Sequence, residues 1–129
     1  MKEMIYSLGR KIEILHAGNY KGFDFCIMNL GTHPTAYVRL SEDHNYYNKH
    51  YDEIDIDCHY GLTFGKVATF NEIEGYWIGW DYAHCGDYVG HNIRFKGTDL
   101  DGERDKKWTT QEIYEEVKNV IEQLKEVKK

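Results

Sequence analysis

The C-terminal stretch constrains the fold more than any other part of this chain, because it carries both a start signal and a buried face for one helix. Thr109 and Glu112 have the spacing of a capping box, in which the threonine caps the helix and the glutamate reaches back to the cap. Five apolar residues then recur at helical spacing, on one face: Ile113, Val117, Val120, Ile121 and Leu124. We therefore predict a helix over about residues 110–126 that packs on a sheet.

Upstream of this helix, the apolar residues alternate in the way that is typical of strands. The turn Gly31-Thr32-His33-Pro34 predicts an antiparallel hairpin on its two sides. Ser41 begins a polar stretch as the cap of a short helical turn, and the glycine- and charge-rich range 86–107 predicts a long surface loop. The expected strands are 11–18, 23–30, 35–40 and 76–82. We expect residues 1–129 to form a single α+β domain, a small, mainly antiparallel sheet packed by a C-terminal amphipathic helix.

Charge and cysteine usage narrow the functional class. The net charge of -6 opposes binding to nucleic-acid backbones, which requires a positive field. No apolar run approaches the length of a membrane helix, and the first residues lack a signal-peptide core. The three cysteines are an odd number without C-x-x-C spacing, which favours a reducing compartment. We expect a cytoplasmic protein with no membrane partner.

Two segments share an unusual set of polar residues, IDIDCHYGLTFG at 54–65 and WIGWDYAHCGD at 77–87. If the strands before them are neighbours, their ends meet at one edge of the sheet. Imidazole and carboxylate groups there suit a divalent metal such as zinc, manganese or iron, or an acid–base pair. The candidate set for catalysis or metal binding is His59, Asp81, His84 and Asp87, with Asp57 beside it. The alternative is structural: the aspartates cap turns and the histidines hydrogen-bond to backbone carbonyls.

Residues next to this set have two interpretations each. Gly61 would let backbone amides approach a ligand. His44 lines the same cleft or lies in an exposed loop, and Trp80 stacks a ring or packs in the core. Cys58 and Cys85 are expected to be buried structural thiols rather than nucleophiles or metal ligands. No G-x-S-x-G, Walker or Rossmann pattern is present.

The two segments resemble a family of small phage and prophage proteins with the motifs H-G-G-L-T-[YF] and W-[WI]-[IF]-G-F-D-C-A-H-A-G-D. The resemblance covers about Gly22 to Lys125, including EIYEEVKNVIEQL near the end. The positions that match the family pattern are His44, His59, Gly61, Leu62, Thr63, Phe64, Gly79, Asp81, Ala83, His84, Gly86 and Asp87. The resemblance supplies a context but no reaction, and it favours one shared site.

The departures from the family pattern are informative. The glycine expected after His59 is Tyr60, and the phenylalanine expected before Asp81 is Trp80. The expected cysteine is Tyr82, which argues against an essential thiol at that position.

Three functions follow as hypotheses. The first is a phage-type protein that binds a small ligand, such as a nucleotide-type defence signal, as a homo-oligomer. Its ligand-binding residues would be His44, Tyr60, Gly61, Thr63, Trp80 and Tyr82, with Arg39 or Arg94 at a phosphate. The second is a hydrolase of a nucleotide-like substrate, with His59 or His84 as the base, Asp81 as its partner and Asp87 as a second carboxylate or metal ligand. The third is an acidic inhibitor of a host protein.

Overall fold

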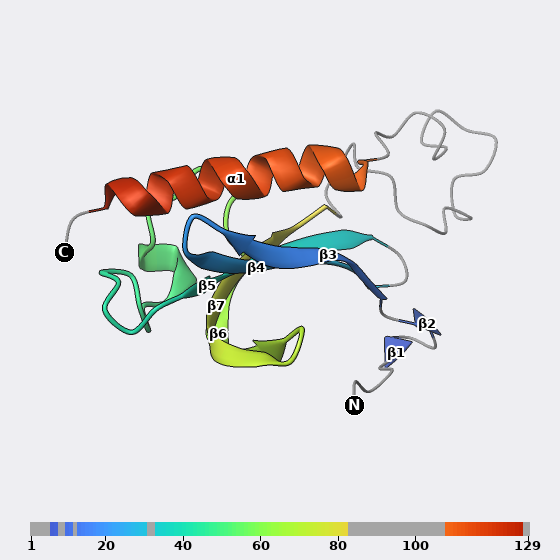
Figure 1. Cartoon of the computed structure of the whole chain (residues 1–129), viewed down its shortest axis with the longest axis horizontal. Helices are drawn as coiled ribbons and strands as arrows, with labels where there is room; N and C mark the ends of the chain where they lie inside the picture. Colours follow the sequence, from blue (N-terminus) through green and yellow to red (C-terminus); the bar gives the residue numbers. More distant parts are fainter. Residues whose placement is uncertain (1–5, 8–9, 12, 31–32, 83–107, 128–129) are drawn as a thin grey trace.

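The α+β prediction is confirmed by the computed structural model, which describes residues 6–7, 10–11, 13–30, 33–82 and 108–127. A five-stranded antiparallel sheet has the order β3-β4-β5-β7-β6, and one helix, α1, crosses one face of it (Figure 1). Two short strands pair at the N-terminal end. The elements are β1 Tyr6–Ser7, β2 Arg10–Lys11, β3 Glu13–Tyr20, β4 Phe23–Asn29, β5 Pro34–Leu40, β6 Phe64–Phe70, β7 Ile73–Asp81, the 3₁₀ turn η1 Tyr51–Glu53 and α1 Thr110–Glu126.

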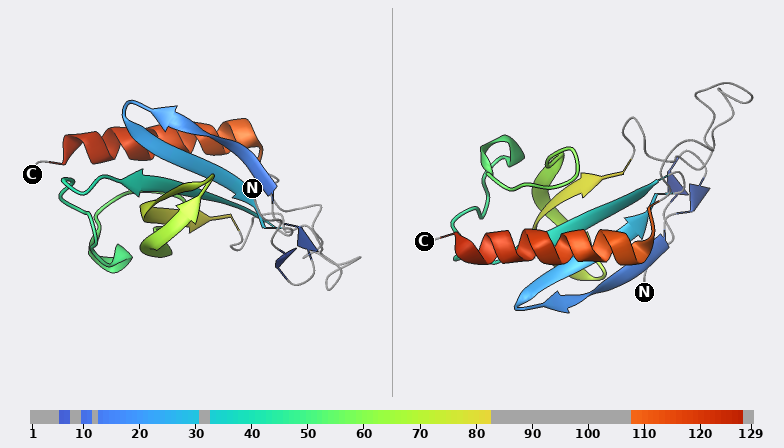
Figure 2. Two further views of the ribbon diagram at one scale, coloured as in Figure 1. Left: turned by 60° about the horizontal axis from the view of Figure 1, so that its bottom comes forward. Right: turned by 90° about the horizontal axis from the view of Figure 1, so that it is seen from above.

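The helix matches its prediction in position, cap and buried face. The Glu112 N–H donates to Thr109 Oγ1 at 3.1 Å, and the Thr109 N–H donates to Glu112 Oε1 at 3.0 Å, which completes the capping box. All five predicted apolar residues are buried. The helix lies over β3, β4 and β5, as the view from above shows (Figure 2). Among the described residues, no helix is long and apolar enough to span a membrane.

The strand predictions need two corrections. The first strand does not end at Gly18 but runs on to Tyr20, and the chain turns at Lys21 and Gly22, which both have positive φ. Two consecutive positive φ values give the tight hairpin turn whose twist matches the flanking strands. The second correction is β6, which the alternation pattern did not predict. Ser41 starts a turn without a helix, and the whole range 86–107 lies outside the described residues.

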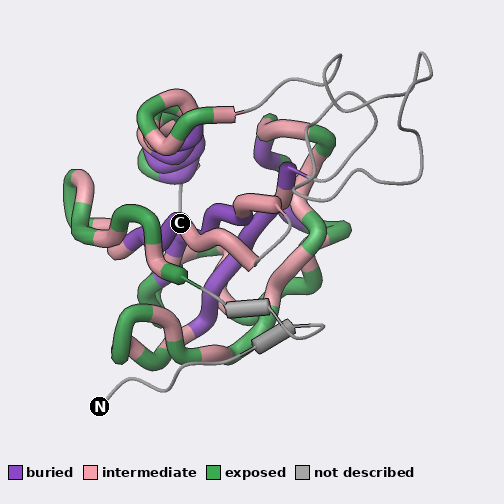
Figure 3. Tube along the Cα trace, turned by 90° about the vertical axis from the view of Figure 1, so that its right-hand side faces the viewer, coloured by how far each residue is buried: buried purple, intermediate pink, exposed green. Residues whose placement is uncertain are grey.

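Both faces of the sheet bury large side chains. The helix-facing side carries the main core, including Ile27, Val38, Ile78 and Trp80. The opposite face carries a second cluster around Cys26, Tyr37 and Trp77, which no helix covers in the described part of the chain. The buried segments run through the middle of the sheet (Figure 3).

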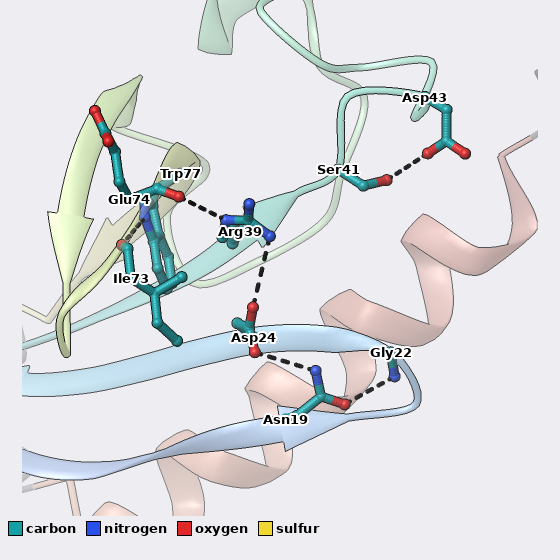
Figure 4. Close-up of polar contacts among 9 residues, drawn as sticks. All are labelled: Asn19, Gly22, Asp24, Arg39, Ser41, Asp43, Ile73, Glu74 and Trp77. Carbon is teal, nitrogen blue, oxygen red and sulfur yellow. Dashed lines mark hydrogen bonds and ion pairs between the residues drawn. The ribbon is translucent and has the colours of Figure 1, made fainter.

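Glycines on β7 create the space for this second cluster. Tyr37 lies over Gly79, and the Arg39 side chain lies over Gly75. Arg39 Nε donates to the Glu74 carbonyl at 3.0 Å, and its Nη1 lies 3.6 Å from Asp24 Oδ2 (Figure 4). Arg39 is paired with Trp77, four residues along β7 from Asp81, so it lies away from the candidate site at the end of this strand.

Candidate functional site

The described parts of the two polar segments, 54–65 and 77–82, lie side by side at one end of the sheet. The N–H of Thr63, in the loop before β6, donates to the carbonyl of Gly79 on β7 at 2.9 Å. The Thr63 hydroxyl donates to Asp81 Oδ2 at 3.3 Å. The loop 57–63 therefore runs next to the end of β7, although residues 54–57 before it form no strand.

The ring of His59 is the centre of an aromatic group that we call the His59 cluster: His59, Tyr60, Tyr82 and Trp108. His59 stacks on Tyr82 with a centroid distance of 4.6 Å and an interplanar angle of 13°. The Trp108 ring meets it at 5.0 Å and 64°, and the Tyr60 ring at 4.8 Å and 85°. Edge-on and parallel contacts of this kind stabilise ring clusters and hold the imidazole in one plane.

Trp108 is a member of this cluster that the motif analysis missed. It lies directly before the capping threonine of α1, so the start of the helix fixes its place relative to His59. The available signal was a tryptophan at the residue before an N-cap, where an apolar side chain often packs against the protein. Because the position lies about twenty residues beyond the second motif, the motif spacing did not include it.

Next to the stacked rings of His59 and Tyr82, a buried hydrogen-bond chain connects β7 to α1. Trp80 Nε1 donates to the Tyr82 hydroxyl at 3.0 Å, and this hydroxyl donates to the Glu116 carboxylate. Burial raises the pKa of Tyr82 above its ordinary value of 10.0, and the hydrogen bond to Glu116 raises it further. The Tyr82 hydroxyl therefore stays protonated and serves as a fixed donor to Glu116.

This burial corrects two predictions about ligand contacts. Trp80 is 1% exposed and Tyr82 is 0% exposed, so both rings belong to the core rather than to an open stacking surface. Tyr82 acts on the site indirectly, because its ring stacks on the His59 ring and holds that ring in place.

Tyr60 differs from the other members of the cluster because its side chain is 62% exposed. Its φ is +56°, in the left-handed region, and the next residue, Gly61, has a φ of +83°. The turn is closed by the Gly61 N–H, which donates to the Cys58 carbonyl at 2.9 Å. A left-handed conformation costs a non-glycine residue roughly 1–2 kcal/mol, so Tyr60 is held in a strained backbone conformation.

The base of the loop is fixed to the helix through the side-chain amide of Gln123. The Asp57 N–H donates to Gln123 Oε1 and Gln123 Nε2 donates to the Asp57 carbonyl, each at 2.8 Å. The side-chain amide of Gln123 thus makes with Asp57 the same pair of donor and acceptor bonds that the backbone of a neighbouring strand would make. The Asp57 side chain itself is exposed, so the residue contributes to the loop mainly through its backbone.

His44 has a structural role in the described region. The Tyr46 N–H donates to His44 Nδ1 at 3.0 Å, so Nδ1 is an acceptor. The proton is then on Nε2, which donates to the Leu124 carbonyl in the last turn of α1 at 3.0 Å. Because both ring nitrogens hold protein groups, His44 ties the 41–50 loop to the helix instead of presenting a free nitrogen to a ligand.

The predicted metal or acid–base set is brought together only in part. Consecutive residues of a strand point to opposite faces, so Asp81 points away from the helix while Tyr82 and the stacked His59 lie on the helix side. Within the described part of the chain, no group of three His, Cys, Asp or Glu residues is placed to hold a metal ion. His84, Cys85 and Asp87 lie outside the described residues.

Cys58 is a thiol that burial protects. Burial raises the pKa of the Cys58 thiol from 9.0 to about 12, and the carboxylates of Glu116 and Asp57 add to the increase. The thiolate is the nucleophilic form of cysteine, and it is nearly absent at neutral pH with such a pKa. The prediction that Cys58 is a structural thiol rather than a nucleophile agrees with this environment.

The raised pKa predicts a loss of stability in alkaline solution. The stabilising contribution of a protonated Cys58 is complete below pH 9.0 and is lost as the pH rises toward 12. We expect a total loss of about 2 kcal/mol from this residue, after a reduction for solvent screening of a half-buried group. Urea unfolding at half-unit pH steps measures this loss. In Cys58→Ser, the free energy of unfolding should fall less between pH 9 and 10, before the tyrosines titrate. An unchanged slope in Cys58→Ser would contradict this assignment.

Comparison with known proteins yields no relative for this chain. No protein-family model matches it, and searches of curated proteins and of solved structures return no match.

Proposed function

We propose that this protein binds a small ligand with a planar ring at the His59 cluster, and that Tyr60 stacks on that ring. The observation that carries the proposal is the conformation of Tyr60, whose large ring is 62% exposed and whose φ is +56°. Exposed rings held in a strained backbone conformation are concentrated at binding sites, where the surrounding structure fixes them before the ligand arrives.

The neighbouring groups support a ligand of the nucleoside type. His59 offers a ring edge next to Tyr60, and Thr63 on the same loop offers a side-chain hydroxyl. Stacking on a base is tolerant of its identity, because every base has a π-face. The net charge of -6 and the engagement of Arg39 with Asp24 and Glu74 make base and sugar better candidates for the described contacts than phosphate.

The resemblance to phage and prophage proteins adds a biological context to this proposal. A compact binding protein that retains a nucleotide-type signal without converting it would remove that signal from a host defence pathway. Retention predicts a bound ligand that is released unchanged when the protein is denatured.

The decisive variant is Tyr60→Leu, titrated with adenosine, guanosine, cytidine and uridine by calorimetry. We expect at least one ribonucleoside to bind the wild type, and Tyr60→Leu to weaken that binding by about tenfold or more, because base–aromatic stacking contributes about 1–3 kcal/mol. Tyr60→Phe keeps the ring and should bind like the wild type.

Tyr51→Leu is the matched control. Tyr51 follows a histidine and stacks on it, with ring centroids 4.4 Å apart at 28°, but in the 3₁₀ turn η1. Its replacement should leave affinity unchanged. Equal loss of affinity in both leucine variants, or no binding of any ribonucleoside to the wild type, would overturn the proposal.

The same samples separate binding from the hydrolase alternative. Chromatography of the ligand after incubation should return it intact. Conversion that is lost in His59→Ala would replace the binding proposal by a hydrolase with His59 as the base.

A further inference from the structure

The contacts of His44 require its ring to be neutral. Its Nδ1 accepts from the Tyr46 N–H at 3.0 Å, and its Nε2 donates to the Leu124 carbonyl in the last turn of α1 at 3.0 Å. A ring nitrogen can accept a hydrogen bond only while it carries no proton. A protonated ring would direct an N–H group at the N–H of Tyr46, so the two groups would repel each other where they now form a bond.

The bond to His44 Nδ1 closes a turn at the start of the loop 41–50. The Tyr47 N–H donates to the His44 carbonyl at 3.0 Å, and the His44 N–H donates to the Ser41 carbonyl at 3.0 Å. Further along, the loop has a separate attachment, because the Tyr76 hydroxyl donates to the Lys49 carbonyl. The part of the loop that depends on the imidazole is therefore the range 44–47, which we call the His44 turn.

Within the described part of the chain, no carboxylate is paired with His44 to stabilise a charge on its ring. The rings that contact it are Phe23 at a centroid distance of 6.0 Å and Tyr46 at 5.7 Å. The charged residues nearest in the chain to its contacts are Glu42 and Asp43 on its own loop, Lys21 and Asp24 on the β3–β4 hairpin, and Glu122, Lys125 and Glu126 on α1. None of them forms an ion pair with His44, and Asp24 and Glu122 have cations of their own, Arg39 and Lys21.

We propose that His44 is an acid-sensitive clasp, whose protonation opens the His44 turn. Histidine is the side chain whose charge changes between about pH 5 and 8. As the pH falls through this range the ring takes up a proton, the bond from the Tyr46 N–H is lost, and the turn loses the contact that closes it. The stabilising contribution of this bond is complete in neutral solution and is lost in acid. The clasp is independent of ligand binding at the His59 cluster.

His50 makes the same kind of contact in a setting that tolerates the charge. Its Nδ1 accepts from the Asp52 N–H at 3.2 Å, but the ring also lies 3.6 Å from Asp52 Oδ2, and its side chain is 58% exposed. A protonated His50 therefore exchanges one hydrogen bond for an ion pair with the same residue. This makes His50 the matched control for His44.

The experiment follows the full chain, labelled with nitrogen-15 and without ligand, by NMR from about pH 7.5 to about pH 5, the range in which histidine titrates. The ring nitrogens of His44 report its protonation, and the backbone order parameters of Tyr46 and Tyr47 report the mobility of the turn. We expect these order parameters to fall from about 0.85, typical of rigid backbone, to below about 0.6. The fall should have the same midpoint as the change in the ring nitrogens, while the amides of α1 stay rigid.

The variant His44→Asn separates the charge from the bond. An asparagine side-chain oxygen accepts from the N–H two residues further on and does not titrate. The turn of His44→Asn should therefore remain rigid over the whole range, whereas His50→Asn should open in acid like the wild type. The clasp is overturned if the wild-type turn stays rigid while the His44 ring becomes protonated, if the ring stays neutral at the acid end of the range, or if His44→Asn opens with the wild-type midpoint.

Discussion

Gly79→Ala should destabilise the protein by about 3 kcal/mol, even though alanine is normally favoured over glycine inside a strand. The reason is the close approach of β5 to β7 at this position. A Cβ on Gly79 would overlap with the Tyr37 ring and lie 2.8 Å from the Ala36 carbonyl oxygen. Tyr37 is only 8% exposed and the carbonyl belongs to the backbone, so neither can move aside at low cost. Urea unfolding followed by tryptophan fluorescence measures the change.

Gly75→Ala, four residues earlier on β7, is the matched control. Its new Cβ would meet the Arg39 side chain, which is flexible and partly exposed. We expect a loss of about 1 kcal/mol, from the displaced bond to Glu74 and a weakened surface ion pair. In the Gly79→Ala background, Tyr37→Leu should cost less than it does alone, because it relieves the overlap. Similar losses for the two alanine variants would contradict this account of the second face.

The helix could be predicted in full because its signals are local. The capping box lies within four residues, and the apolar face repeats over the following turns. Hairpin β6–β7 could not be predicted in this way. Its turn uses Asn71 and Glu72, both with positive φ, and a glutamate is not a residue from which such a turn is inferred. On the face of β6 that carries Phe64 and Phe70, lysine and alanine stand between them, and Val67, the other large apolar residue of the strand, is exposed on the opposite face.

The sequence grouped the two polar segments at one edge of the sheet but did not resolve the roles of their residues. That grouping depended on neighbouring strands before both segments, whereas residues 54–57 form no strand and the loop 57–63 contacts the end of β7 through Gly79 and Asp81. Burial was the missing information. Alternation puts Trp80 and Tyr82 on one face and Trp77 on the other, but it does not say which face is covered, and here both faces bury tryptophan. The close approach of Tyr37 to Gly79 depends on cross-strand register, which no local pattern contains.

Tyr82→Phe should destabilise the protein by about 2–3 kcal/mol, although it removes one oxygen atom. The Tyr82 hydroxyl accepts from Trp80 Nε1 at 3.0 Å and donates to the Glu116 carboxylate. Its loss leaves the indole N–H of a fully buried tryptophan without an acceptor, and buried donors without partners cost about 1–3 kcal/mol. Guanidinium unfolding at pH 7 measures the change. Glu116→Gln keeps an acceptor for the hydroxyl and should cost less than half as much.

Tyr20→Phe is the control that separates burial from the hydrogen bond itself. The Tyr20 hydroxyl also donates to a glutamate of α1, Glu122 Oε2, at 3.1 Å. Glu122 is partly exposed and keeps its ion pair with Lys21 at 2.7 Å. Water and this ion pair therefore compensate for the hydrogen bond that Glu122 loses in Tyr20→Phe. We expect less than about 0.5 kcal/mol for Tyr20→Phe. Equal effects in the two phenylalanine variants would mean that the Tyr82 hydroxyl is not the link between β7 and the helix, and that the packing of the rings alone holds His59 in place.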